Sequence, residues 1–314
     1  MSGTSWTHLI RFVAVEDGLE HLGQICNPPE VGDVGLASLR GEEIKAYLVT
    51  GSVFDGRVTD KVMTVSRRSL PPQSTRWNVS KNKPAAPGQQ LLSPLRSSQV
   101  PVIRCLGLNY RDHAREANME VPAQPVLFLK PRTALSGPRP EKTPVPRAAQ
   151  DGSSDYEAEL VVVVGRDVRD AGEGDAMDCV LGYTAGNDVS ARTHQWRSSQ
   201  WCFSKVAGFD GSCPIGPALV SRSAITDPQS LGIKATLSGA TVQDSSTSQM
   251  IFSVAKTIAF LSQGITIERG TLIMMGTPPG IGAMRDPKVW LKDGDDMRVW
   301  IEGIGTLVNE IYYE

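Results

Sequence analysis

Two glutamates, Glu157 and Glu159, stand at the start of an apolar run of four valines that ends at Gly165. The run predicts a buried strand over residues 155–164, and side chains two positions apart on a strand project to the same side. Two carboxylates about 7 Å apart at this place repel each other and lose hydration, and a cation between them offsets both costs. The alternative interpretation is an edge strand that carries both glutamates on a solvated face.

A third carboxylate favours the cation. A second short strand is predicted over residues 179–186, and Asp188 follows its end. A strand, a turn-rich link and a returning strand can bring Asp188 beside the glutamate pair. Three hard oxygen ligands without a thiolate or an imidazole favour Mg²⁺, Mn²⁺ or Ca²⁺ over zinc. Water and a chelating substrate are expected to complete the coordination.

The next candidates lie upstream of the glutamates. His113 and Glu116 are three residues apart in a predicted helical turn over residues 109–118, so a carboxylate can orient an imidazole that acts as a general base. The alternative is an ordinary surface ion pair. Lys130 ends a predicted strand over residues 126–131. It is either a surface charge or a cation that meets an anionic substrate beside the metal.

Asp188, Arg192 and Gln195 follow one another at spacings of four and three residues. If the chain is helical from Val189 onward, the three side chains share one face. That face would present a metal ligand, a guanidinium that binds carboxylates, and an amide.

Composition excludes several classes of protein. Lys and Arg total 32 against 34 Asp and Glu, a net charge of −2, so no overall field attracts nucleic acid. No apolar run approaches the roughly 20 residues of a membrane span, and the N-terminus does not resemble a signal peptide. The five cysteines include no C-x-x-C pair. We therefore expect an intracellular, reduced protein, cytoplasmic or alternatively mitochondrial, with no nucleic-acid or membrane partner.

The distribution of residue types predicts three parts. Residues 1–66 contain short β-like runs between glycines and form a small β-rich N-terminal domain. Residues 67–100 are rich in proline and serine and form a connection without a long helix or a central strand. Residues 101–314 carry all the chemistry above and form a metal-dependent catalytic domain.

Other motifs are excluded. The chain has no G-x-S-x-G, no H-E-x-x-H, and no G-x-G-x-x-G after a strand. The glycine-proline loop over residues 276–282 lacks the backbone donors of a phosphate cradle, because two adjacent prolines remove two N–H groups. Residues 250–261 predict an amphipathic helix whose aromatic side chains belong to the core.

Several short motifs, in this order, resemble the fumarylacetoacetate hydrolase superfamily over roughly residues 100–314. They are G-L-N-Y-x-x-H-x-x-E, F-L-K-P, D-Y-E-x-E-L, N-D-x-S-A-R, S-K and F-D, C-P-I-G-P, G-T-P-P-G-I-G and I-E-G-I-G-T-L-x-N. The resemblance implies an α+β fold: a mixed β-roll of the C-terminal type of that family with flanking helices, beside the small β-rich N-terminal region, commonly in a homodimer. The most similar branch contains acylpyruvate hydrolases, oxaloacetate decarboxylases and isomerase/decarboxylases.

The resemblance also implies roles. Glu157, Glu159 and Asp188 hold Mg²⁺ or Mn²⁺, and His113 and Glu116 form a water-activating dyad on a lid. Lys205 stabilises developing negative charge, and the expected contacts to substrate oxygens are Arg192, Gln195, Lys130 and Thr277. One departure concerns Lys205. Relatives have one small residue between this lysine and an aromatic-Asp pair, whereas here three residues separate Lys205 from Phe209. The two extra residues either bulge outward or rotate the lysine out of the site.

The implied activity is divalent-metal-dependent hydrolysis of the C–C bond of a small 2,4-dioxo acid, an acylpyruvate. The alternatives are decarboxylation of an oxaloacetate-type substrate, keto-enol or double-bond isomerisation, a non-catalytic member that binds a small dicarboxylate, and a specialised biosynthetic enzyme. Hydrolysis is favoured because both His113 and Glu116 are present.

Overall fold

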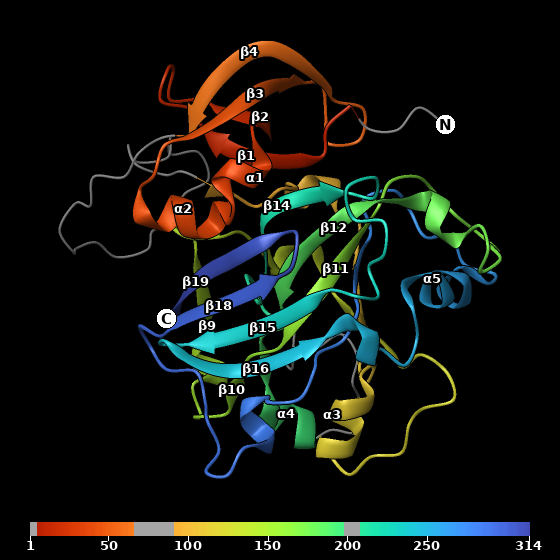
Figure 1. The fold of residues 1–314 in the computed structure, drawn as a ribbon. Helices are drawn as coiled ribbons and strands as arrows, with labels where there is room; N and C mark the ends of the chain where they lie inside the picture. The colour runs from red at the N-terminus through yellow and green to blue at the C-terminus, as the bar shows by residue number, and fades with distance from the viewer. Residues whose placement is uncertain (1–4, 66–90, 198–207) are drawn as a thin grey trace.

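The computed structural model of the chain describes residues 5–65, 91–197 and 208–314 (Figure 1). The strands of this part are β1 His8–Val13, β2 Glu20–Ile25, β3 Ile44–Thr50, β4 Arg57–Val65, β5 Leu91–Leu92, β6 Ile103–Leu106, β7 Leu127–Lys130, β8 Leu135–Ser136, β9 Lys142–Val145, β10 Ser154–Asp155, β11 Ala158–Val164, β12 Val180–Asn187, β13 Ser190–Ala191, β14 Cys213–Ser221, β15 Gly232–Leu237, β16 Ala240–Ser246, β17 Leu272–Met274, β18 Asp296–Ile301 and β19 Gly305–Tyr313. The α-helices are α1 Pro28–Val31, α2 Val34–Arg40, α3 Arg111–Glu116, α4 Arg192–Arg197 and α5 Val254–Ser262.

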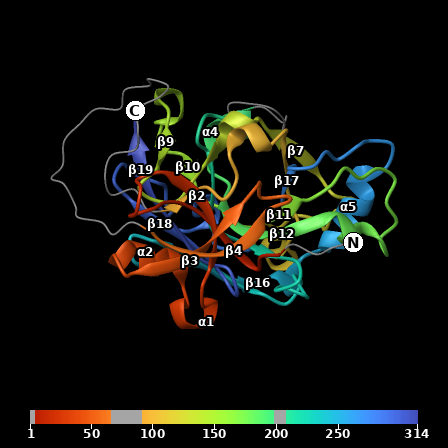
Figure 2. The same cartoon turned by 90° about the horizontal axis from the view of Figure 1, so that it is seen from above.

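The main sheet joins the N-terminal strands β1–β4 to strands from the rest of the chain as far as β17. Its strand order is β4-β3-β2-β1-β14-β12-β11-β17-β6-β7, with β5 beside β1 and β8 beside β14. The N-terminal strands enter this sheet through β1, which pairs antiparallel with β14. Strands β1–β4 gather at one end of the molecule, and Figure 2 looks down on them. Most pairs are antiparallel, whereas β17 and β6 are parallel, so the sheet is mixed.

A second sheet of five strands, ordered β16-β15-β18-β19-β9, packs against the middle of the first. Strand β11 is buried on both faces because its side chains alternate between two cores. Leu160 and Val162 belong to the core shared with the five-stranded sheet, and Val161 and Val163 to the core on the other side. The short helices lie outside these layers, so the α+β prediction with a mixed β-roll and flanking helices is confirmed.

The small N-terminal region is also held by helix α2. The Asp33 carboxylate accepts the N–H of Leu36 as an N-cap, and it accepts both the N–H and the hydroxyl of Thr306 from β19. Gly35 packs directly on that strand, since a Cβ there would lie 1.8 Å from the Thr306 carbonyl oxygen. The three-part domain division stays a prediction, because residues 66–90 lie outside the described part.

Two predicted elements have different bounds. The amphipathic helix begins at Val254 instead of Met250, because the Ser253 side chain caps it and Asn109 accepts the N–H of Phe252. The acidic strand is interrupted between β10 and β11, so Glu157 precedes the strand that carries Glu159. No helix in the described part combines the length and apolar character that a membrane crossing requires.

The contact at Gly35 predicts a stability effect. Helix propensity alone would favour alanine there by about 1 kcal/mol, but overpacking typically costs about 1–3 kcal/mol, and this contact is far inside van der Waals distance. We expect Gly35→Ala to lower the free energy of unfolding by about 2 kcal/mol, measured by urea denaturation. Gly174→Ala is the matched control because nothing lies within 4 Å of its Cβ position. Equal stability of the two variants would contradict this packing.

Candidate active site

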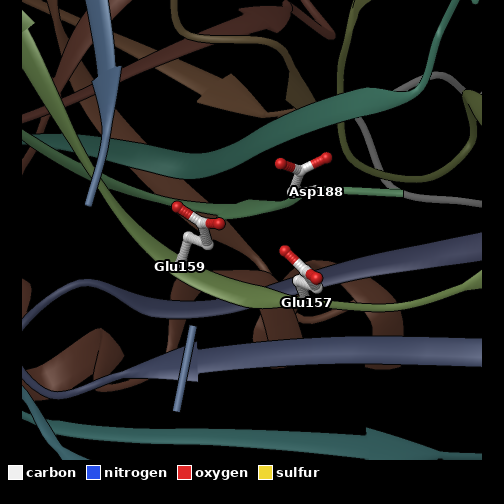
Figure 3. A group of neighbouring side chains, drawn as sticks. All are labelled: Glu157, Glu159 and Asp188. Atoms are coloured by element: carbon white, nitrogen blue, oxygen red, sulfur yellow. The ribbon is translucent and has the colours of Figure 1, made fainter. Parts of the chain in front are cut away.

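Glu157, Glu159 and Asp188 form one group of carboxylates. Each offers an oxygen within 4.8 Å of the others. Figure 3 shows the three side chains turned toward a common space between neighbouring strands. Two oxygens on opposite sides of one Mg²⁺ or Ca²⁺ are about 4 to 5 Å apart, twice the metal–oxygen distance. The spacing therefore suits three ligands of a single ion.

The strands around these carboxylates are central ones. Strand β11 pairs with β12 on one side and with β17 on the other, and Glu159 and Asp188 are fully buried. The edge-strand interpretation is therefore wrong. At the interruption before β11, the Asn187 side chain accepts the N–H of Glu157, and the Glu157 carbonyl accepts the N–H of Asp188. These bonds tie the three ligand positions together.

Burial and mutual repulsion act on the glutamates. Burial, followed by the charges of Asp188 and Glu157, raises the pKa of Glu159 well above its ordinary value. Burial also raises the pKa of Glu157, against the opposing effect of Arg192. Glu159 Oε1 and Asp188 Oδ2 are buried and have no hydrogen-bond partner among the described residues. Buried carboxylate oxygens of this kind fit the role of cation ligands.

Lys130 is fully buried, so its interpretation as a surface charge is wrong. Its Nζ lies 2.8 Å from Asp188 Oδ1 and 3.3 Å from both the carbonyl and the hydroxyl of Ser212. Although burial alone would lower it, the charge of Asp188 raises the pKa of Lys130 overall. The ammonium therefore stays charged and fixes one oxygen of a ligand, which leaves the other oxygen for an ion.

Arg192 is the second buried cation. Its Nε donates to Asp155 at 2.8 Å, its Nη2 pairs with Glu157, and its Nη1 donates to Gln195 at 3.0 Å. The charges of the two carboxylates raise the pKa of Arg192 although burial opposes this.

The condition that the chain be helical from Val189 onward is not met. Ser190–Ala191 pair with Ser154–Asp155 as strands β13 and β10, so α4 begins at Arg192. Asp188 therefore lies outside the helix, while Arg192 and Gln195 do meet on it.

Asp155 belongs to the site although no role was assigned to it from the sequence. Besides Arg192, its carboxylate accepts the N–H groups of Tyr156, Gly282 and Ala283. Two features of the sequence point to Asp155. It belongs to the acidic motif, and the chain contains the glycine-rich loop whose N–H groups bond to it. Asp155 holds Arg192 in place against the metal group.

The formal charges of these groups fit a divalent cation. Four ionised carboxylates, on Asp155, Glu157, Glu159 and Asp188, face two cations, on Lys130 and Arg192. The described group thus has a net charge of −2 when all four carboxylates are ionised. One Mg²⁺ or Mn²⁺ would neutralise it, and the donors are the hard oxygens that such ions prefer.

His113 and Glu116 lie together on α3. His113 Nδ1 is 2.9 Å from Glu116 Oε2, and the His113 side chain is only 10% exposed. The other Glu116 oxygen accepts the N–H of Gly280, which connects α3 to the glycine-proline loop. A carboxylate at Nδ1 favours the tautomer with the proton on Nδ1, so Nε2 carries the lone pair of a general base. The geometry is that of an oriented dyad.

The remaining predicted residues have different settings. Thr277 donates its hydroxyl to the Ala158 carbonyl at 3.0 Å and accepts from Gln243 at 2.8 Å, so that hydroxyl already supports β11. Its contact with substrate stays a prediction. Lys205 lies outside the described residues, as do Val206 and Ala207.

Comparison with known proteins gives one family. Residues 102–312 match the family model described as "Fumarylacetoacetate (FAA) hydrolase C-terminal". The chain is 42% identical to a caffeoylpyruvate hydrolase of Neonothopanus nambi over 99% of this chain and 95% of that protein. It is 41% identical to a mitochondrial oxaloacetate tautomerase of Xenopus laevis over 70% of this chain and 68% of that protein.

Solved structures agree with this result. The crystal structure of a 2-hydroxyhepta-2,4-diene-1,7-dioate isomerase from Mycobacterium marinum superposes with a TM-score of 0.73 and 30% identity, covering 98% of this chain and 99% of that one. This solved structure therefore shares the whole fold, including the N-terminal strands. The three relatives differ in the reaction that their names state.

The group of three carboxylates, Glu157, Glu159 and Asp188, predicts that Glu159→Gln has opposite effects on Mn²⁺ binding and on the thermal stability of the metal-free protein. The substitution removes a ligand charge, so Mn²⁺ affinity should fall by more than the roughly 10- to 100-fold that loss of an outer partner costs. Without metal it also removes repulsion among buried carboxylates, so thermal stability in a chelator should stay equal or rise. Electron paramagnetic resonance of free Mn²⁺ and thermal unfolding measure the two effects.

The exposed Glu173→Gln serves as the control. Unchanged Mn²⁺ affinity in Glu159→Gln would contradict the assignment of Glu159 as a ligand.

Proposed function

The chain belongs to the fumarylacetoacetate hydrolase family, and from this premise we propose that it is a divalent-metal-dependent enzyme that hydrolyses the C3–C4 bond of an acylpyruvate. The observation that carries the proposal is the His113–Glu116 dyad, which Gly280 connects to the loop bordering the three carboxylates. Hydrolysis requires a base that activates water, and an imidazole oriented to accept a proton can fill that role. The similarity to a caffeoylpyruvate hydrolase over 99% of this chain supports the same reaction.

In this proposal the chain's residues divide the work. An ion held by Glu157, Glu159 and Asp188 would supply a sink for the charge that develops on the 2-oxo group. His113 Nε2 takes a proton from water, which attacks the C4 carbonyl, and Glu116 stabilises the imidazolium that results. The C3–C4 bond breaks, C3 receives a proton, and the products are pyruvate and one carboxylic acid for each water consumed.

In this proposal the remaining hydrogen-bond donors of the site bind the substrate. Arg192 has five N–H donors, of which three bond to Asp155, Glu157 and Gln195 in the described part. Two stay available for a substrate carboxylate, and the amide nitrogen of Gln195 can join them. Lys205 would stabilise the negative charge of the leaving enolate, and Thr277 would border the same oxygens.

Decarboxylation or isomerisation of a 2-oxo dicarboxylate is the second candidate. The relatives named as an oxaloacetate tautomerase and as a dioate isomerase favour it, and neither reaction consumes water. Decarboxylation needs only the electron sink of the metal site, whereas isomerisation also needs a base that moves a proton. Loss of the dyad therefore separates hydrolysis from decarboxylation, and the consumption of water separates hydrolysis from isomerisation. If the protein turned over no 2-oxo acid, the non-catalytic alternative, a protein that binds a small dicarboxylate, would be favoured. The specialised biosynthetic alternative depends on which acyl group the enzyme accepts.

The finer assignments complete the proposal. The ion is Mg²⁺ or Mn²⁺, and the assembly is a homodimer, as the family resemblance implies. The substrate is a small 2-oxo acid, and an aromatic acyl group such as that of caffeoylpyruvate is supported by the fungal relative. The location is the cytoplasm or, as the name of the Xenopus relative suggests, the mitochondrion.

Replacing the base tests the proposal. His113→Ala should lower the rate of caffeoylpyruvate hydrolysis by about 10²- to 10⁴-fold, while oxaloacetate decarboxylation keeps a substantial part of its rate. Release of pyruvate, measured with lactate dehydrogenase, reports hydrolysis, and CO₂ release reports decarboxylation. Removal of metal with a chelator should abolish both, and Mn²⁺ should restore both.

His21→Ala is the matched control, because His21 also pairs with a carboxylate, Asp17 at 2.9 Å, but lies in the N-terminal region. Equal losses on both substrates in His113→Ala would show that His113 does not act by activating water. A wild-type enzyme that releases no pyruvate from an acylpyruvate would reject hydrolysis and favour the second candidate.

A further inference from the structure

The phenol of Tyr110 is a buried donor without a partner. The residue is fully buried, and its hydroxyl has no hydrogen-bond partner among the described residues. A buried hydroxyl left in this state costs about 1–3 kcal/mol, so such groups in native proteins are normally bonded to protein, water or a ligand. Neither the core packing nor the proposed chemistry accounts for this hydroxyl.

The position of Tyr110 connects it to both halves of the site. Tyr110 is the residue immediately before α3, and its carbonyl accepts the N–H of Ala114 in the first turn. It therefore orients the helix that carries His113. On its other side, Asn109 packs against Gly276, where an added Cβ would lie 2.8 Å from the Asn109 Cβ.

Gly276 in turn donates its N–H to Glu159 Oε2 at 2.7 Å. Only two short contacts thus separate the backbone of Tyr110 from a metal ligand. Burial, and next the charge of Glu159, raises the pKa of the Tyr110 phenol, which agrees with a hydroxyl close to that carboxylate. Glu159 Oε1 lacks a donor in the same region.

We propose that Tyr110 is a positioning residue of the metal centre, whose phenolic O–H donates a hydrogen bond to an oxygen of the ligand shell beside Glu159. The inference rests on the divalent ion of the proposed function and extends it to a residue with no assigned role. The bonded oxygen belongs to water or substrate, because the hydroxyl makes no hydrogen bond with either Glu159 oxygen. The bond orients the shell and connects it to the start of α3.

In this arrangement the Tyr110 hydroxyl destabilises the metal-free protein and stabilises the metal-bound protein. In metal-free protein, the tyrosine buries an unsatisfied donor, so a phenylalanine of the same shape is neutral or stabilising. In the metal-bound protein, the donor has a partner, and its loss resembles the loss of an outer-shell hydrogen bond, which typically weakens metal binding by about 10- to 100-fold.

The experiment compares Tyr110→Phe with Tyr183→Phe in the full chain. Tyr183 on β12 is also fully buried with an unpartnered hydroxyl, but its charged neighbours are Arg222 and Asp227. We expect Tyr110→Phe to weaken Mn²⁺ binding by about 10- to 100-fold in the absence of substrate, and Tyr183→Phe to leave it within about twofold. Thermal unfolding in a chelator should show Tyr110→Phe at least as stable as the wild type.

The possible outcomes separate the inference from the proposed function. Unchanged Mn²⁺ affinity in Tyr110→Phe, or an equal loss in both variants, would overturn the inference and leave the proposed function standing. Destabilisation of Tyr110→Phe in the chelator would assign the hydroxyl a structural role and overturn the inference as well. A wild-type protein that binds no Mn²⁺ would overturn both.

Discussion

The structure depends on the charge balance of one buried group. Burying a carboxylate without a partner is strongly unfavourable. Three buried carboxylates, on Asp155, Glu159 and Asp188, and the partly buried Glu157 lie where β10, β11 and β12 meet. Lys130 and Arg192 compensate two of the four, each at a fixed partner. The remaining charge of −2 is the property that selects a divalent ion, and the neighbouring elements serve to keep it in place.

Two kinds of element contribute to the site, central strands and one short helix. The ligand carboxylates stand on or beside central strands that are packed on both faces, so their oxygens are held in position without the ion. His113, the proposed base, stands on α3, a helix of six residues that bonds to the glycine-proline loop through Glu116 and Gly280. Arg111 donates to the Met250 carbonyl, and Asp112 accepts the hydroxyl of Ser245, so the helix is also held from the other side.

The sequence predicted that the three carboxylates lie together, because their positions follow from periodicity. A buried valine run, an acidic start and a returning strand were enough to bring Asp188 beside Glu159. The interruption before β11 was not predictable, because it depends on the Asn187 side chain replacing a backbone partner at Glu157. The start of α4 at Arg192 depends on the pairing of β10 with β13, two-residue strands that carry no periodic signal. The burial of Lys130 follows from tertiary packing on the carboxylates, which no local pattern contains.

The setting of Lys130 changes what the family resemblance implies about substrate binding. The resemblance assigned it to substrate oxygens, but a lysine whose Nζ lies 2.8 Å from Asp188 and 3.3 Å from both the carbonyl and the hydroxyl of Ser212 already has an oxygen for each of its three protons. Moving it to a substrate would break the buried ion pair with Asp188 and give up both contacts with Ser212. In this setting Lys130 acts as a counter-ion of Asp188. In the proposed function, the substrate carboxylate is therefore assigned to Arg192 and Gln195, on the helix that follows Asp188.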